Sequence, residues 1–337
     1  MKDALYGGVN VAVLTAMRPE LQRPDFQRMD LSIDLDRMAA HCRWLLAQGA
    51  NGLGVLGTTG EANSLGISER LHLMEGLVER GLPAEKMLPG VGVPALTDTL
   101  AMARRAAELG CRGALVLPPF FYKNPSEDGL FAYYSEIAQR LGGALKIYFY
   151  HFPAQSAVPI TVPLIARLLR AHPGAFQGLK DSTGDWSNTK SYIDHFAADG
   201  FEVYSGDDSH LLQNLQAGGA GSISAASNVS AATNAQVYAT WDQPTATDAQ
   251  TRLTAMRSAV TSAPLIPGLK SLVARHTGES DWETVRPPHT KLTADQRAKL
   301  FATFDACGNP LAAARPSIAS SNTPGPSTRK ASSTAPN

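Results

Sequence analysis

Short apolar runs alternate with amphipathic stretches along most of the chain. The stretches carry apolar residues at helical spacing, and each run is short enough to be a buried strand. Strands that alternate with helices in this way are typical of a parallel sheet, either closed into a barrel or doubly wound. The candidate strands are Val9–Leu14, Gly52–Leu56, Leu88–Val91, Gly113–Leu117, Leu145–Tyr150, Phe176–Leu179, Glu202–Ser205 and Gly221–Ser224.

The first candidate strand decides between the two sheet architectures. A doubly wound dinucleotide-binding sheet would need a GxGxxG turn after this strand, and Gly7-Gly8 does not provide one. The number of candidate strands favours an α/β fold of the (β/α)₈ (TIM) barrel type, which we assign to residues 1–233.

Two further segments follow the predicted barrel. Residues 234–308 have the pattern of additional C-terminal helices in the same unit, one of them opened by Pro264-Leu265-Ile266-Pro267. Residues 309–337 are rich in Ser, Pro, Ala and Thr and hold almost no large apolar side chains. Such a segment buries too little surface to offset its chain entropy, so we expect a disordered tail.

Composition excludes several classes of protein. Hydrophobic residues make up 44% of the 337 positions, which predicts a substantial core, and 30 basic residues balance 30 acidic ones. Without a basic excess, a nucleic-acid partner is not expected. Cys42, Cys111 and Cys307 form no CxxC pair and the eight histidines no HExxH motif, so we expect neither disulfides, a metal nor a cofactor.

The apolar segment Gly7–Met17 follows Lys2 and raises the question of a signal peptide. Asp3 weakens the positive start, and Arg18-Pro19-Glu20 is a poor cleavage context. A first strand is the better interpretation. No run reaches the roughly 18 apolar residues of a membrane span, so a cytoplasmic protein without membrane contact is expected.

Lys180 directly follows a strand that should lie inside the barrel, at the end where barrel enzymes carry their active sites. Most lysines are solvated. A buried amine, however, loses the solvation of its ammonium form, and the neutral nucleophile becomes accessible. From position alone this interpretation and an ion pair with Asp181 stay equally open.

Two more strand ends carry polar groups. Gly57-Thr58-Thr59-Gly60-Glu61 permits a tight turn with exposed N–H groups and hydroxyls suited to a carboxylate, although many such turns bind nothing. Tyr150 ends another strand, where a phenol can transfer protons. Taken alone, Tyr150 fits an aromatic core residue whose hydroxyl caps a backbone group better than a proton-transfer group.

Together these positions resemble the dihydrodipicolinate synthase / N-acetylneuraminate lyase superfamily of class I aldolases. The resemblance runs from about Tyr6 to Leu300, and each motif by itself is modest. Five motifs in the right order at suitable strand ends make a specific pattern. They are Gly57-Thr58-Thr59-Gly60-Glu61, Pro119-Phe120-Phe121-Tyr122, Tyr150-His151-Phe152-Pro153, Gly178-Leu179-Lys180-Asp181-Ser182 and Ser205-Gly206-Asp207-Asp208.

The resemblance implies catalytic roles for four residues. Lys180 matches the lysine that forms a Schiff base, and Tyr150 matches the tyrosine that relays protons. Thr58 and Thr59 match the pair that binds the carboxylate of a 2-oxo acid, with Thr58 also hydrogen-bonded to that tyrosine. Such chemistry needs no metal or organic cofactor, because the protonated imine itself accepts electrons.

The resemblance also implies residues around this centre. Tyr122 matches an aromatic residue lent by a neighbouring subunit, although Phe121 could take its place because the loop is one residue longer here. Gly206 and Ile223 match backbone positions of the pocket, and Asp208 matches a contact to substrate hydroxyls. An active dimer or a tetramer follows from the same resemblance.

Two departures bear on the substrate. Dihydrodipicolinate synthases carry an arginine after the Tyr-x-x-Pro element, where this chain has Gln155. A glutamine cannot form a charged fork with a carboxylate, a loss of roughly 1.5–3 kcal/mol of binding. Sialic-acid lyases place an acidic residue after the position of Asp208, where Ser209 stands. Gln155 is therefore expected to bind a different substrate.

The resulting hypothesis is a lyase that makes or breaks a carbon–carbon bond of pyruvate or a related 2-oxo acid, with a 2-oxo-3-deoxy sugar acid as substrate. A dehydratase or decarboxylase using the same imine, dihydrodipicolinate synthase itself, and a non-catalytic 2-oxo acid sensor stay open as alternatives. A phosphate-binding barrel is disfavoured, because Gly218-Gly219-Ala220-Gly221 precedes the last strand instead of following it.

Overall fold

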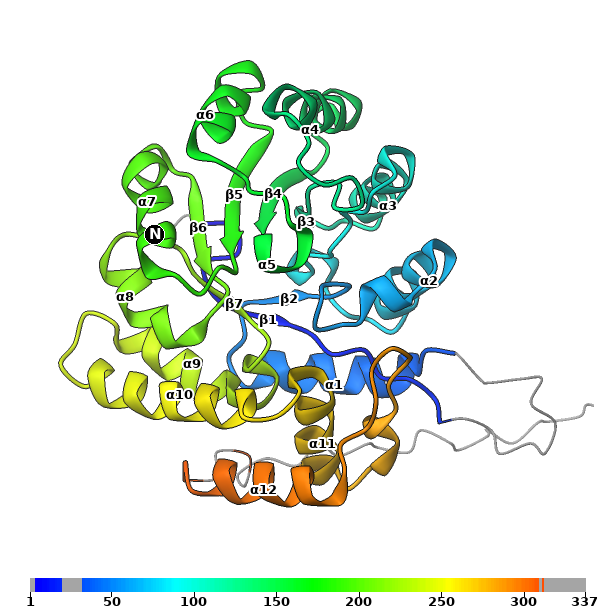
Figure 1. The fold of residues 1–337 in the computed structure, drawn as a ribbon, viewed down its shortest axis with the longest axis vertical. Coiled ribbons are helices and arrows are strands. Elements are labelled where there is room, and N and C mark those ends of the chain that lie inside the picture. Colours follow the sequence, from blue (N-terminus) through cyan, green and yellow to red (C-terminus); the bar gives the residue numbers. More distant parts are fainter. Residues whose placement is uncertain (1–3, 20–31, 309–310, 312–337) are drawn as a thin grey trace, which may run out of the picture.

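The structure of the protein, a computed structural model, describes residues 4–19, 32–308 and 311. Its centre is a parallel sheet of seven strands in the order β2-β1-β7-β6-β5-β4-β3 (Figure 1). The strands are β1 (Gly8–Ala12), β2 (Gly52–Gly54), β3 (Gly113–Val116), β4 (Lys146–His151), β5 (Phe176–Asp181), β6 (Glu202–Ser205) and β7 (Gly221–Ser224).

The remaining predicted strand, Leu88–Val91, joins the two edges of this sheet, β2 and β3. Its backbone N–H groups donate to Leu53 O (2.9 Å) and Val55 O (2.8 Å) on one side and to Leu115 O (2.9 Å) on the other. The segment forms isolated bridges instead of a regular ladder. It nevertheless closes the sheet, and the predicted (β/α)₈ barrel is confirmed.

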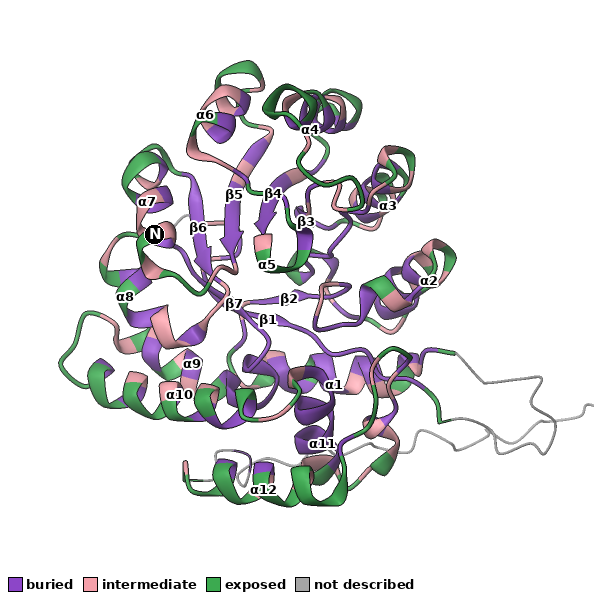
Figure 2. Cartoon of the chain, in the orientation of Figure 1, coloured by how far each residue is buried: buried purple, intermediate pink, exposed green. Residues whose placement is uncertain are grey.

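Helices surround the barrel, with buried inner faces and exposed outer faces (Figures 1 and 2). In α1 (Leu35–Ala47) the spacing predicted from sequence buries Leu35, Met38, Cys42 and Leu45. The other helices of the ring are α2 (Ile67–Glu79), α3 (Leu96–Glu108), α4 (Glu127–Leu141), α6 (Val162–Ala171), α7 (Trp186–Phe196), α8 (Leu211–Gln216) and α9 (Ser227–Thr240).

Three helices extend the ring at its C-terminal side. These are α10 (Ala246–Thr261), α11 (Leu265–Thr277) and α12 (Ala294–Asp305), and α10 and α11 both contact α9. The predicted boundary between residues 233 and 234 falls within α9. Except for Leu311, the predicted tail 309–337 lies outside the described residues.

The barrel interior is filled by side chains. Tyr148, Tyr204 and Ile223 are fully buried there, and the hydroxyls of the two tyrosines donate to the buried Glu202 carboxylate at 2.9 and 2.6 Å. Burial raises the pKa of Tyr148 above its usual range, so it remains a donor. A filled interior leaves only the ends of the strands open to a ligand.

Within the described part of the chain, no helix is long and apolar enough to cross a membrane. The same residues contain no cluster of three or more His, Cys, Asp or Glu side chains placed to hold a metal ion.

Candidate active site

A cavity of about 650 Å³ opens at the carboxyl ends of the strands, where the sequence placed the site. Its walls come from the turn after β2, the ends of β4 to β7, and the C-terminal helices. The lining residues include Thr58, Thr59, Glu61, Tyr150, Phe152, Gln155, Lys180, Gly206, Asp207, Arg257 and the segment Pro264–Pro267.

Lys180 and Tyr150 meet in this cavity from adjacent strands. They are register partners in the β4–β5 pair, so both side chains point to the barrel axis. The Lys180 Nζ atom lies 4.3 Å from the centroid of the Tyr150 ring, and Lys180 is only 5% exposed. No described carboxylate lies within ion-pair distance of Nζ.

Asp181 faces the other side of β5, because successive strand residues alternate in direction. Its carboxylate accepts hydrogen bonds from Thr189 Oγ1 (2.6 Å) and Thr183 Oγ1 (2.9 Å), and lies 3.2 Å from His151 Nδ1. The alternative of a Lys180–Asp181 ion pair is therefore wrong. The structure favours the other interpretation, a buried amine.

Asp181 gives a prediction for stability in acid. Burial alone would raise its pKa, but hydrogen bonds from His151 and Thr189 outweigh burial and hold the pKa below its usual value. The resulting stabilisation is complete above the unfolded-state pKa of about 3.9 and is lost as pH falls through the folded-state pKa. Asp181→Asn should therefore be less stable than the native protein at pH 7 in urea unfolding, and the gap should narrow below about pH 4. A gap that stays constant with pH would contradict this.

The threonine turn stands against Tyr150. Thr58 Oγ1 lies 3.2 Å from the Tyr150 hydroxyl, and Thr59 is buried at the cavity wall. A Cβ at Gly60 would come within 2.9 Å of the Val13 carbonyl oxygen, so only glycine lets the turn pack this closely against the end of β1. The sequence motif thus brings two threonines into the same cavity as the Lys180 amine.

A buried ion pair anchors this turn from behind. Glu61, in the left-handed conformation (φ 54°), pairs with Lys270 of α11, and neither side chain is exposed. Glu61 also accepts the backbone N–H of Arg286 (3.1 Å), and Lys270 donates to Thr284 O (2.6 Å). The C-terminal helices therefore hold the threonine turn in place.

The turn after β6 differs in detail from its prediction. Gly206 lines the cavity as expected, and a Cβ there would lie 2.3 Å from Ser182 Oγ. Asp208 does not line it: its side chain is fully buried beside Asn234, and burial raises its pKa. Asp207 faces the cavity instead.

Three other predicted residues are placed as follows. Gln155, on the short helix α5 (Pro153–Ser156), lines the cavity. Ile223 lies beneath it among the side chains of the barrel interior, without forming its wall. Tyr122 is 75% exposed, packs edge-on against Phe121, and lies outside the cavity of this single chain.

The sequence analysis missed the contribution of the C-terminal helices. Arg257 of α10 and the segment Pro264–Pro267 line the cavity, although no strand precedes them. One pattern pointed to Arg257. It stands four residues after the buried Leu253 and three before the buried Val260, so a charged residue lies on the apolar face of a helix.

Comparison with known proteins agrees with this geometry. Residues 25–307 match the model of the dihydrodipicolinate synthetase family. The chain is 34% identical over 275 residues to an uncharacterized DapA-like lyase of Chloroflexus aurantiacus, covering 81% of this chain and 90% of the relative. It is 31% identical over 302 residues to the 4-hydroxy-tetrahydrodipicolinate synthase of Listeria innocua, covering 89% and 98%.

Solved structures give the same result. The dihydrodipicolinate synthase of Agrobacterium tumefaciens is 30% identical with a TM-score of 0.77, covering 89% of this chain and 99% of that one. A prophage protein of E. coli K12 from the same family, solved in complex with pyruvate, is 25% identical with a TM-score of 0.80, covering 91% and 100%.

Proposed function

The chain belongs to the dihydrodipicolinate synthetase family and is a lyase of the aldolase type, and from this premise we propose that Lys180 forms a Schiff base with pyruvate or a related 2-oxo acid. The observation that carries the proposal is the environment of its amine. Lys180 is buried in the cavity beside the Tyr150–Thr58 hydrogen bond and has no carboxylate partner among the described residues.

The substrate would bind with its carboxylate on the threonine turn. Thr58 and Thr59 offer hydroxyls, and the turn offers backbone N–H groups, close to the amine. This would place the ketone carbon next to Lys180 Nζ. Positioning of this kind converts a bimolecular attack into an effectively unimolecular one. The pyruvate bound to the E. coli relative supports a ligand of this class.

The chemistry would proceed through the imine. The neutral amine adds to C2 of the 2-oxo acid, and the carbinolamine loses water to give an iminium ion. The 4-hydroxyl then loses its proton and becomes a carbonyl, the C3–C4 bond breaks, and its electron pair moves to the iminium to form an enamine, so that the C4 fragment leaves as an aldehyde. Protonation at C3 and hydrolysis release pyruvate and the free amine.

Each of these steps moves a proton, and Tyr150 is the group placed to do so. Its hydroxyl lies at the cavity wall, 3.2 Å from Thr58 Oγ1, which can pass the proton on. Tyr122 would complete this path in a neighbouring subunit, whereas Phe121 in the same place would pack against the site without carrying a proton. The exposure of both rings supports such an assembly, a dimer or a tetramer.

The substrate would be a hydroxylated 2-oxo acid of the 2-oxo-3-deoxy sugar acid type. Gln155 stands where dihydrodipicolinate synthases carry an arginine. Together with Asp207 it gives the cavity hydrogen-bonding groups that suit substrate hydroxyls. A panel of 2-oxo acid aldols should be screened for pyruvate release. A product that keeps every carbon but has lost water would instead assign a dehydratase working through the same imine.

Borohydride reduction tests the imine directly. Incubation with pyruvate and borohydride should add one reduced pyruvate to the protein, and peptide mapping should place it on Lys180. Lys180→Arg should form no adduct. Lys190→Arg, a change of a partly exposed lysine on α7, should form as much adduct as the native protein. If no lysine carries an adduct, the covalent mechanism is wrong.

A further inference from the structure

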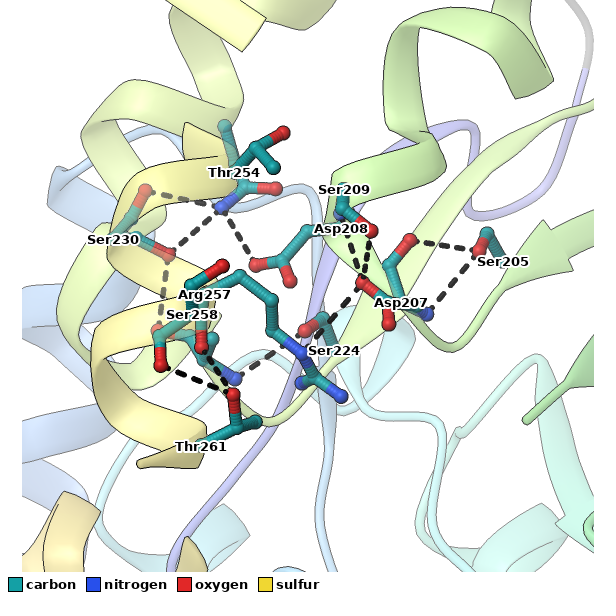
Figure 3. Close-up of polar contacts among 12 residues, drawn as sticks. Ser205, Asp207, Asp208, Ser209, Ser224, Ser230, Thr254, Arg257, Ser258 and Thr261 are labelled. Atoms are coloured by element: carbon teal, nitrogen blue, oxygen red, sulfur yellow. Dashed lines mark hydrogen bonds and ion pairs between the residues drawn. The ribbon is translucent and has the colours of Figure 1, made fainter. Parts of the chain in front are cut away.

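The cavity holds one cation that the imine chemistry does not use. Arg257 reaches it from α10, and its Nε atom lies 3.6 Å from Asp207 Oδ1 (Figure 3). Apart from Lys180, it is the only lysine or arginine among the described residues that line the cavity. Its side chain is 19% exposed, which is low for a charged group on a helix surface.

Asp207 holds one edge of the Arg257 guanidinium and is itself fixed. Its carboxylate accepts the backbone N–H of Ser209 (2.9 Å) and the Ser209 hydroxyl (2.6 Å). Burial alone would raise the pKa of Asp207, but Arg257 and Ser209 outweigh burial and keep the pKa below its usual value. Asp207 is thus a charged, ordered partner that orients the arginine.

The other edge of the guanidinium is available. The ion pair with Asp207 is made through Nε, and no hydrogen bond or ion pair of the described residues uses Nη1 or Nη2. The planar fork presents two parallel N–H donors, a geometry that matches the two oxygens of a carboxylate. The Arg257 guanidinium is half-buried, and its Nη1 and Nη2 atoms have no partner among the described residues, so they can bind an anion.

Charge decides which anion fits. Asp207 already offsets part of the positive charge of Arg257, and the nearby Asp208 carboxyl is fully buried, with a pKa raised by burial. A phosphate dianion would need more positive charge than this group supplies. A single carboxylate is the better match.

We propose that Arg257 binds a second carboxylate at the far end of the substrate, so that the lyase acts on those hydroxylated 2-oxo acids that carry a carboxylate at both ends. This inference rests on the proposed function, since it assumes that the first carboxylate and the ketone occupy the threonine turn and Lys180. It assigns to α10 the distal recognition that Gln155, which is uncharged, cannot supply at its own position.

Two five-carbon ligands isolate this contact. 2-Oxoglutarate and 2-oxopentanoate differ only in a terminal carboxylate against a methyl group, and both can be trapped on Lys180 by borohydride. The native protein should trap 2-oxoglutarate at about 10- to 100-fold lower concentration, the range expected for a charge-assisted bidentate contact. In Arg257→Gln this ratio should fall to about one, and Arg257→Lys should keep part of it.

Arg252→Gln is the matched control. It removes one positive charge from the exposed face of the same helix, where Arg252 bonds to Gln236, and should leave the ratio at its native value. A structural role of Arg257 alone would weaken trapping of both ligands equally and leave the ratio unchanged in Arg257→Gln, which overturns the inference.

Three other outcomes of the trapping experiment each lead to a different conclusion. A native ratio near one, with both adducts formed on Lys180, would sink the second carboxylate site and leave the proposed imine chemistry intact. Absence of every adduct would instead remove the proposed function itself. An Arg257-dependent preference for a 2-oxo acid ending in a phosphate monoester over 2-oxoglutarate would replace the carboxylate by a phosphate and overturn the substrate class.

Discussion

Tyr150→Phe should lower kcat for aldol cleavage by about 10²- to 10⁴-fold, the usual contribution of a positioned acid–base group. The phenyl ring would still fill the wall beside Lys180, so the packing around the amine is kept. Only the hydroxyl that lies 3.2 Å from Thr58 Oγ1 is lost. Steady-state assays of pyruvate release should therefore show a large fall in kcat and a small change in KM.

Two controls separate proton transfer from structure. Tyr238→Phe removes a hydroxyl from α9, outside the cavity, and should leave kcat near its native value. Thr58→Val removes the other end of the hydrogen bond and should also slow turnover, with a less-than-additive effect in the double variant, because the two hydroxyls act as a unit. A Tyr150→Phe enzyme that turns over at the native rate would assign proton transfer to another group.

The barrel could be predicted because most strands are short, largely apolar runs and most ring helices have an apolar stripe. Leu88–Val91 shows where such reasoning stops. Its apolar letters predict a strand, and its hydrogen bonds to Leu53, Val55 and Leu115 confirm the position. Gly90 lets the segment approach its neighbour so closely that a Cβ there would lie 2.4 Å from Leu56 O. The result is a bridge instead of a regular strand, which no hydrophobic pattern encodes.

The residues of the candidate site could likewise be predicted only in part from the sequence. Lys180 and Tyr150 could be singled out as candidates because they stand at the ends of predicted strands, but their roles, like that of Thr58 in the turn after β2, followed only from the family resemblance. Arg257 was not predicted, because its place depends on how α10 packs against the turn after β6, and a charged residue on the apolar face of a helix does not by itself specify that packing. Asp208 was expected at the cavity, but Asp207 lines it and Asp208 is buried, because the order of residues in a tight turn does not say which of two neighbours faces the cavity.

Lys270→Met should destabilise the protein by about 3–5 kcal/mol, one of the largest effects expected of a single substitution outside the catalytic residues. The variant would leave the Glu61 carboxylate buried, with no exposure to water and without its cation. Urea unfolding at neutral pH would measure the loss. Arg275→Met is the matched control, because Arg275 lies on the same helix as Lys270. The change breaks a partly exposed ion pair with Asp305 of α12 and should cost about 1 kcal/mol or less.

The same substitution tests whether the C-terminal helices position the catalytic turn. Glu61 lies two residues after Thr59 in the same turn, so a loosened Glu61 should raise the pyruvate concentration needed for trapping on Lys180, measured where the variant is still folded. Adding Glu61→Gln to Lys270→Met removes the unpaired charge and should recover part of the stability, but it should not restore tight trapping, since the anchor stays broken. If the double variant recovered both stability and tight pyruvate trapping, the Glu61–Lys270 pair would act only on global stability. If Lys270→Met alone were as stable as the native protein, another group would compensate the charge of Glu61.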